Sequence, residues 1–397
     1  MQEIELSIFD RGDGGALIQP MLDEFEQAHK VHVNLQVLDW EAGWSNLVEV
    51  ALYGHGPDLS EVGSTWVMDF VRMNAVNSLS PLELASIGSE KDFITTNWNS
   101  AIVKASASHT PVVWAIPWTS DIRMAYYRRD LFDKANIDPA HAFEHSDSLS
   151  HAMETLKTKD ATPPLTLGTL YSHINPHIMA SWIWDAGGDF IAPDGKRVAF
   201  DSPEALRGMS SYFQLAKYIP ANRREIVYAE SDQLFTSGKA AITFSGYWIV
   251  RDLGLSTPIV QDNLGMRAMP SASFVGGTHL LTWKHSRKRD LTFTLIDFMV
   301  KHSAEYNLFL AYGLPAYAPS WEKAHFLPEP YFTTLFEALQ KGRSFPISEL
   351  WGLVEKRLTD AIPTIWEKVW DADEHDIEKI LAEIILPLAN RINMTLE

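Results

Sequence analysis

The sequence predicts an α/β protein with more than one domain, and three observations support this prediction. Residues 4–59 alternate strand-like and helix-like segments. The chain has 397 residues, a length typical of two or three domains and sufficient to bury large cores. Apolar runs of about 20 residues, the length needed to cross a membrane, do not occur in it. A soluble α/β fold is therefore expected.

The N-terminal part has the order of elements that forms a parallel sheet. The predicted elements are a strand at 4–9, a helix at 16–29, a strand at 31–38, a helix at 44–52 and a short strand that starts at Pro57. This order indicates a parallel α/β sheet. Ligands of such sheets bind beyond the carboxyl ends of the strands. The loops of interest are therefore 10–15, 39–44 and 63–66.

The rest of the chain continues to mix strands and helices. We expect strands at 112–117 and 240–244, helices at 130–135, 145–157, 178–184, 203–218 and 231–237, a loop at 157–164, and mostly helix up to Ile392. Ser202 precedes Pro203 and is predicted to cap the helix that follows. Asp194-Gly195 is a hairpin turn signal. These cap and turn signals place most of the polar motifs at the ends of predicted helices and strands.

Composition excludes several classes of function. The net charge is 33 minus 51, or −18, which disfavours nucleic acid and anionic membranes and suits a neutral ligand. The absence of cysteine excludes disulfides, thiolate metal sites and Cys nucleophiles. Fourteen Trp and twelve Tyr are typical of proteins that grip sugar rings, although packing is expected to account for more than half of them.

The N-terminus carries no secretory signal, because Met1-Gln2-Glu3 leads straight into a strand pattern. We therefore expect either a cytoplasmic protein or a sequence that begins at the mature end of a secreted one.

Seven motifs then occur in a fixed order along the chain. They are 56–59 (GPDL), the block 115–117, 125–132 and 135–139 (AIP, AYYRRDLF, ANIDP), 186–188 (AGG), 235–241 (FTSGKAA), 246–248 (GYW), 274–277 (FVGG) and 313–316 (GLPA). This series resembles the family 1 extracellular solute-binding proteins of ABC importers, the group that includes the maltose-binding proteins. Arg128 replaces the usual Asn, and Asn136 replaces the usual Gly in a left-handed turn that Asn also tolerates.

The resemblance covers nearly the whole chain and implies a fold. That fold is the type II periplasmic-binding-protein fold, in which two α/β lobes are joined by a hinge that the chain crosses more than once, with the ligand cleft between them. Transferred to this sequence, one lobe comprises 1–117 with 277–315, and the other comprises 118–276 with 316–397.

The resemblance also implies a function. The protein is expected to be the extracytoplasmic substrate-binding component of an ABC importer, located in the periplasm or anchored at the cell surface. It would close around a soluble monosaccharide, oligosaccharide or polyol and deliver it to the membrane permease. We expect a monomer without enzymatic activity, cofactor, bound metal or nucleic-acid partner.

A sugar site needs a flat aromatic surface for the ring face and charged or amide groups for the hydroxyls. Trp248 is the leading candidate, because it follows a buried strand and matches a family Trp that packs on a sugar ring. Asp121 matches an acidic ligand residue of the maltose-binding relatives. The full set of candidates is Arg11, Asp13, Trp44, Ser64, Thr65, Trp66, Asp121, Asn175, His177, Trp248, Gly277, Trp351 and Glu355.

Three of these residues depart from the maltose-binding pattern. Asn175 and His177 stand where relatives carry a carboxylate and an aromatic residue, and Glu355 is acidic where maltose binders are basic. Trp351 and Glu355 are four residues apart, hence on one helix face. His177 lacks further ligands at the spacing a metal site needs. The departures predict a ligand other than maltose.

Other interpretations stay open at this point. Asp121 and Glu355 would be the paired carboxylates of a glycosidase or lyase. A receptor of the same fold for a polyamine, a glycerophosphodiester or a metal chelate is a second alternative, and a domain that acts on a protein partner is a third. Trp40 is a further candidate like Trp44, whereas packing roles are expected for Trp114, Trp182, Trp366 and Trp370.

Overall fold

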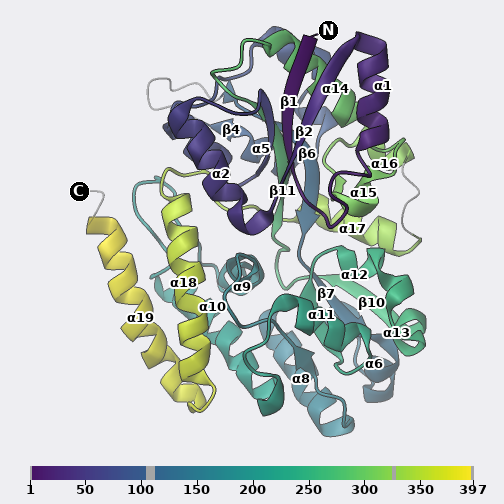
Figure 1. The fold of residues 1–397 in the computed structure, drawn as a ribbon. Coiled ribbons are helices and arrows are strands. Elements are labelled where there is room, and N and C mark those ends of the chain that lie inside the picture. The colour runs from purple at the N-terminus through teal and green to yellow at the C-terminus, as the bar shows by residue number, and fades with distance from the viewer. Residues whose placement is uncertain (1, 104–111, 324–327, 395–397) are drawn as a thin grey trace. The chain divides into compact units, whose positions relative to one another are not determined.

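The chain folds into two compact α/β units (Figure 1), which confirms the predicted fold class. The computed structural model describes residues 2–103, 112–323 and 328–394. Unit 1 consists of Met1–Asp121 and Val275–Pro328, and unit 2 of Ile122–Phe274 and Glu329–Glu397. The chain therefore passes between the units three times.

The last of these passages lies after Pro328, whereas the predicted boundary between the lobes follows Pro315. The reason is local pairing with unit 1. β12 (Leu314–Pro315) pairs with β6 (Ile116–Ile122), and Trp321 donates its indole N–H to the Pro315 carbonyl at 2.9 Å. Backbone pairing and a buried indole hold the segment in unit 1, and these interactions leave no motif in the sequence.

The sheet of unit 1 has the strand order β12-β6-β11-β3-β1-β2. Its remaining strands are β1 (Gln2–Phe9), β2 (Val31–Leu38), β3 (Leu59–Gly63) and β11 (Val275–Thr282). β1 runs parallel to β2 and β3, as the alternation of strands and helices predicts. β11 is antiparallel to β3, and β12 is antiparallel to β6. The parallel part that the sequence predicts is therefore extended by strands from later in the chain.

Helices cover both faces of this sheet (Figure 1). They are α1 (Gln19–His29), α2 (Trp40–Tyr53), α3 (Val67–Arg72), α4 (Pro81–Ile87), α5 (Thr95–Ser100), α14 (Arg289–His302), α15 (Leu308–Ala311) and α16 (Pro319–Lys323). Ile8 of β1 packs in a cluster with side chains of α1 and α14, and the next residue, Phe9, packs with those of α2 and α3. Because successive side chains of β1 point to opposite faces of the sheet, they contribute to two separate hydrophobic layers.

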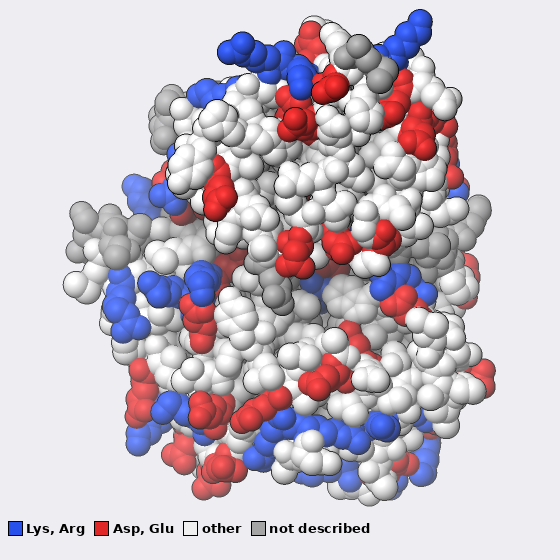
Figure 2. All heavy atoms as spheres, in the orientation of Figure 1, with Lys and Arg blue, Asp and Glu red and all other residues white. Residues whose placement is uncertain are grey.

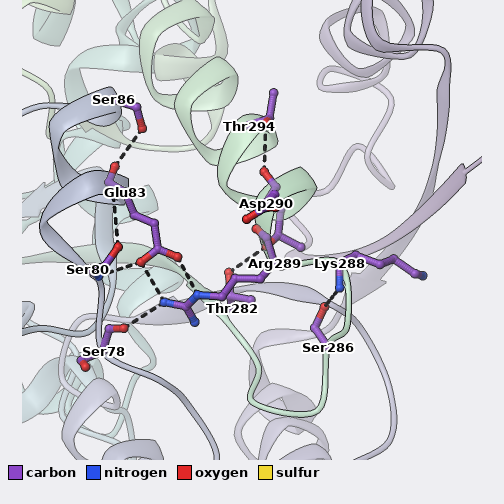
Figure 3. A network of polar contacts seen from close by, with 11 residues as sticks. Ser78, Ser80, Glu83, Ser86, Thr282, Ser286, Lys288, Arg289, Asp290 and Thr294 are labelled. Atoms are coloured by element: carbon purple, nitrogen blue, oxygen red, sulfur yellow. Dashed lines mark hydrogen bonds and ion pairs between the residues drawn. The ribbon is translucent and has the colours of Figure 1, made fainter.

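A polar network joins α4 to α14 in unit 1 (Figure 3). Ser80 and Glu83 form a capping box at the start of α4. Arg289, the first residue of α14, donates to both carboxylate oxygens of Glu83 at 2.5 and 3.0 Å and to the Ser78 carbonyl at 2.9 Å. One arginine therefore fixes the starts of two helices that lie far apart in the sequence.

The sheet of unit 2 has the order β10-β7-β9-β8. Its strands are β7 (Met124–Arg128), β8 (Leu165–Thr166), β9 (Ile242–Ser245) and β10 (Leu264–Ala268). β8 is parallel to β9, and β7 is antiparallel to β9 and β10. The carboxyl ends of β8 and β9 and the start of β7 therefore meet at one edge.

Most of unit 2 is helical. Its helices are α6 (Arg129–Ala135), α7 (Pro139–Ala142), α8 (Ser146–Lys159), α9 (Ile174–Asp185), α10 (Pro203–Phe213), α11 (Tyr228–Thr236), α12 (Trp248–Arg251), α13 (Pro258–Asn263), α17 (Tyr331–Lys341), α18 (Trp351–Val369) and α19 (Glu374–Met394). Trp182 and Trp366 are buried, and both pack edge-on against Tyr212. The packing roles predicted for these two tryptophans are confirmed.

Several element boundaries differ from the predictions. α9 begins at Ile174, so the segment predicted as a loop around Asn175 and His177 is the first turn of a helix. α2 begins at Trp40 and α8 ends at Lys159, each extending beyond its predicted range. Residues 16–18 form a turn before α1. These errors are typical of helix ends, where short-range signals are weak.

Local turn chemistry is predicted correctly in three places. Asn136 adopts a left-handed conformation with φ of 54°, as Gly would. Gly195 has φ of 71° in the turn after Asp194. The Ser202 hydroxyl accepts from the Ala205 N–H at 3.2 Å and caps α10. Each outcome depends only on neighbouring residues.

Within the described residues, no helix has both the length and the apolar character needed to cross a membrane. Figure 2 shows acidic and basic side chains interspersed over the visible face. The negative net charge is thus spread among cations on this face rather than confined to one block.

Candidate ligand-binding regions of the two units

Three tryptophans gather at the carboxyl ends of the parallel strands of unit 1. Phe9 ends β1, and its ring stacks on Trp40, with centroids 4.0 Å apart and planes at 15°. Trp66, which follows β3, meets Phe9 and Trp44 edge-on at 5.7 and 5.4 Å. Trp40 keeps 43% of its surface exposed. The structure therefore brings Trp44 and Trp66 together with the further candidate Trp40, which is the exposed member.

A buried ion pair lies beside these rings. The Arg11 guanidinium bonds both carboxylate oxygens of Glu61, at 2.5 and 2.9 Å. It also donates to the carbonyls of Phe9 at 2.5 Å and Tyr312 at 3.4 Å, and its central carbon lies 5.1 Å from the Trp40 ring centroid. Both terminal nitrogens of Arg11 are thus engaged by the protein itself. We infer that this residue supports the aromatic cluster rather than contacting a ligand.

Asp13 belongs to the same end of the sheet. One of its oxygens accepts from the Leu17 N–H at 2.9 Å, and the Tyr312 hydroxyl donates to that oxygen at 3.3 Å. Burial and the neighbouring Asp13 charge raise the pKa of Tyr312 well above its usual value, so this hydroxyl stays a donor. Asp13 thereby fixes the loop that carries Arg11.

Two predicted site residues have structural roles in the unit 1 sheet. Gly277 has φ of 135°, and a Cβ there would lie 2.0 Å from the Thr119 carbonyl oxygen. Its own carbonyl accepts from the N–H of Ser64 at 2.9 Å, and Ser64 is buried. Strand packing accounts for the small size of Gly277, and its predicted ligand contact stays a prediction. Thr65 is half-buried in the turn before α3, and Asp121 is partly exposed near the end of β6.

Trp248 begins α12, just after β9 ends at Ser245. Its indole N–H donates to Oδ2 of Asp232, on α11, at 2.7 Å. The Arg123 guanidinium lies 5.1 Å from the centroid of the Trp248 ring. A Cβ on Gly246 would lie 2.1 Å from the same ring. The leading candidate is therefore half-buried and held by neighbours at the edge of the unit 2 sheet.

Charge is buried beside this tryptophan. Burial raises the pKa of Asp232 to about 6, although the bond from Trp248 and the positive Arg123 both oppose the rise. Arg123 itself is buried and directly precedes β7, the strand that pairs with β9. Sequence reasoning missed both residues. An arginine between apolar strand segments is a signal that could have identified Arg123, because a buried cation requires a partner.

The structure pairs two more of the predicted residues. His177, on α9, lies 3.3 Å from the Glu355 carboxylate of α18, and its ring stacks on Phe274 with centroids 4.2 Å apart. These are polar groups of suitable type for ligand hydroxyls. Both side chains are mostly covered, at 15% and 11% exposed.

Asn175 and Trp351 lie in the interior of unit 2. Asn175 is fully buried, and its amide donates to the Leu170 carbonyl at 3.0 Å. Trp351 is 3% exposed and stacks on Phe345 with centroids 3.9 Å apart. Packing and a backbone hydrogen bond thus engage both side chains, and their predicted ligand contacts stay predictions. On the shared face of α18, Trp351 packs on Phe345, whereas Glu355 meets His177 of α9.

Among the described residues, no cluster of three or more His, Cys, Asp or Glu is placed to hold a metal ion. The groups available to a ligand are thus aromatic rings, carboxylates, an imidazole and hydroxyls.

The chain thus consists of two α/β units with aromatic and charged groups at the carboxyl ends of strands. The family of bacterial extracellular solute-binding proteins matches residues 10–306, and the chain belongs to this family. Its members are receptors for solutes rather than enzymes.

Individual relatives are distant. The diacetylchitobiose-binding protein DasA of Streptomyces coelicolor is 22% identical over 303 residues, which cover 73% of this chain and 67% of DasA. An ABC transporter solute-binding protein from Thermotoga lettingae, solved with alpha-D-tagatose, has a TM-score of 0.79 at 18% identity, covering 100% of both chains. Maltose-bound MalE3 of T. maritima has a TM-score of 0.80 at 18% identity, again covering 100% of both chains. These structures share the fold with this chain.

Proposed function

We propose that this protein binds a soluble, uncharged carbohydrate or polyol and delivers it to the permease of an ABC importer. The observation that carries the proposal is the cluster of Trp40, Trp44 and Trp66 at the carboxyl ends of β1–β3. The exposed Trp40 offers the flat apolar surface that a sugar ring needs, and the parallel strands end where ligands of such sheets bind.

Relatives support the carbohydrate class. DasA is named for diacetylchitobiose, and solved relatives hold tagatose, maltose or D-mannitol. These ligands range from a polyol to disaccharides, and all are uncharged and rich in hydroxyl groups. The acidic composition of this chain is compatible with such a ligand. The proposal includes a periplasmic or cell-surface location and a monomeric receptor.

Candidate ligand contacts are proposed within each unit. They are Trp40 and Trp66 in unit 1, and Trp248, His177 and Glu355 in unit 2.

A thermal-shift screen tests the ligand class. The panel contains mono-, di- and oligosaccharides and polyols, with spermidine and glycerophosphocholine as non-sugar competitors. We expect a hit among the sugars or polyols, confirmed by calorimetry at about micromolar affinity, or roughly 8 kcal/mol. Hits confined to spermidine or glycerophosphocholine would replace the sugar proposal by the non-sugar receptor. Conversion of the bound sugar during incubation would favour an enzyme.

Two alanine variants test the binding residues. Trp40→Ala and Trp248→Ala should each weaken binding at least about tenfold, because stacked aromatic contacts provide about 1 kcal/mol or more together with the apolar area they cover. Tyr53→Ala is the matched control, since Tyr53 is an exposed aromatic residue at the opposite end of α2. Unchanged affinity in both tryptophan variants would remove these rings from the site.

A further inference from the structure

Trp248 is held on two sides by charged groups whose role the proposed function does not explain. Asp232 accepts its indole N–H at 2.7 Å, and the Arg123 guanidinium lies against its ring at 5.1 Å from the centroid. Asp232 comes from α11 and Arg123 from the residue before β7, and both contact this indole. The tryptophan side chain therefore has a fixed orientation before any ligand arrives.

We propose that Asp232 and Arg123 are positioning residues that clamp the Trp248 indole in its ligand-binding orientation. The expected effect on ligand affinity rests on the proposed function. The clamp itself is a property of the ligand-free protein and does not depend on it. An indole can rotate about two side-chain bonds, and a fixed one loses less conformational freedom when a sugar ring stacks on it.

Burial shows that the two charged residues support the ring rather than contact the ligand. Oδ1 of Asp232 is inaccessible to solvent, and Arg123 is 4% exposed. Trp248 and Asp232 are both half-buried, whereas Arg123 is buried. Because the Arg123 side chain and Oδ1 of Asp232 are covered and both residues contact the indole, their role is assigned to positioning the ring.

The clamp depends on the protonation of Asp232. A carboxylate accepts an indole N–H in a charge-assisted bond, which is roughly twice as strong as the bond that a neutral acid accepts. Burial raises the pKa of this carboxyl to about 6, within reach of ordinary pH changes. The groups that face it are the Trp248 indole as the donor, Arg123 as the cation, Asp252 as a negative charge, and the neutral hydroxyls of Ser245 and Tyr228. Sugar affinity should therefore fall about three- to tenfold as the pH decreases from 7.5 to 5.

The first experiment needs no ligand. The indole N–H resonance of Trp248, assigned by its loss in Trp248→Phe, is followed by NMR from pH 8 to pH 4.5. We expect a large shift with a midpoint near pH 6 in the wild type and none in Asp232→Asn. Asp133→Asn is the matched control, because Asp133 is exposed on α6 of the same unit and carries the same charge. A wild-type resonance that does not titrate, or that titrates equally in Asp232→Asn, would overturn the clamp.

The second experiment measures affinity for the sugar or polyol identified by the thermal-shift screen. Asp232→Leu should weaken binding at least about tenfold, because the indole loses its acceptor. Asp232→Asn keeps an acceptor and should bind within about threefold of the wild type at pH 7.5, with no dependence on pH. Wild-type affinity in Asp232→Leu contradicts the proposal. If no sugar or polyol binds the wild type, the proposed function fails, and the NMR titration still decides whether the clamp exists.

Discussion

Arg11 and Glu61 form a two-point ion pair, in which the two guanidinium nitrogens lie 2.5 and 2.9 Å from the two carboxylate oxygens. Their side chains are 9% and 0% exposed. Glu61 also accepts from the Phe9 N–H at 2.8 Å, so the pair joins the ends of β1 and β3 under the Trp40 ring. The position of the exposed tryptophan thus depends on a buried charge pair.

Breaking this pair should destabilise unit 1. Removing one partner leaves the other charge buried without compensation, at a cost of about 3–5 kcal/mol. We expect Arg11→Met and Glu61→Gln each to lower the free energy of unfolding by that amount, measured by denaturant titration. The double variant Arg11→Met/Glu61→Leu should recover part of the loss.

The exposed pair of Arg207 and Glu204 is the control. Its side chains are 59% and 45% exposed, and Glu204→Gln should change the free energy of unfolding by less than about 1 kcal/mol. Equal effects of Glu61→Gln and Glu204→Gln would show that the Arg11–Glu61 pair has no special structural role.

A methyl group at Gly277 should damage the unit 1 sheet. Its Cβ would lie 2.0 Å from the Thr119 carbonyl oxygen, and its φ of 135° is unfavourable for any L side chain. Gly277→Ala should therefore lower the free energy of unfolding by at least about 2 kcal/mol. Gly12→Ala separates the two causes, because Gly12 has φ of 86° but open space around a Cβ. Its loss should be about 1 kcal/mol. A Gly277→Ala protein as stable as Gly12→Ala would exclude the steric explanation.

A methyl group at Gly246 should act on Trp248. The Cβ would lie 2.1 Å from the indole ring, which must then move away from Asp232. We expect Gly246→Ala to weaken ligand binding at least about tenfold in calorimetry, comparable to the loss of one charge-assisted hydrogen bond. Gly254→Ala is the nearby control, since a Cβ there meets no atom within 4 Å. Wild-type affinity in Gly246→Ala would mean that the indole orientation is unimportant.

His279 predicts a pH dependence of stability. Burial lowers the pKa of this histidine to about 4, and its ring lies 2.8 Å from the Ser100 hydroxyl. Its pKa in the unfolded chain is about 6.5. Between these values the unfolded state binds more protons, so the contribution of His279 is present above about pH 6.5 and is lost as the pH falls toward 4.

The expected loss from His279 is roughly 2–4 kcal/mol between pH 6.5 and pH 4. It is measured as the difference in the free energy of unfolding between wild type and His279→Gln across this pH range. The contributions of the other titratable groups are the same in both proteins and cancel in this difference. His141→Gln, at an exposed position on α7, should show no such difference. If the difference in the free energy of unfolding between wild type and His279→Gln does not change with pH, the His279 ring is not held neutral by burial.

Local sequence signals predicted much of the fold, for reasons visible at particular residues. Asn136, Gly195 and Ser202 act through their own backbone conformation or a donor three residues away. The strands β1 and β2 follow from alternating side chains, and Trp182 and Trp366 from their apolar surroundings. Ordered motifs along the whole chain also led to the correct family.

The candidate site was predicted less completely, because sequence does not distinguish a binding surface from a core. Trp351 and Glu355 share a helix face as predicted, but that face is packed against other parts of unit 2. Asn175 was placed in a loop and lies buried in a helix. Arg123 and Asp232 had no motif to mark them, although both contact Trp248.

The sequence alone therefore determined the class of fold, the family and the position of Trp248 at the end of a strand. The tertiary structure decided which side chains stay exposed and which charges are buried beside them. Arg11 meets Glu61 across two strands, and Trp248 meets Asp232 across a helix and a turn. The physical reason is that solvent exclusion and partner choice depend on segments distant in sequence, whereas turns, caps and strand alternation depend on neighbours.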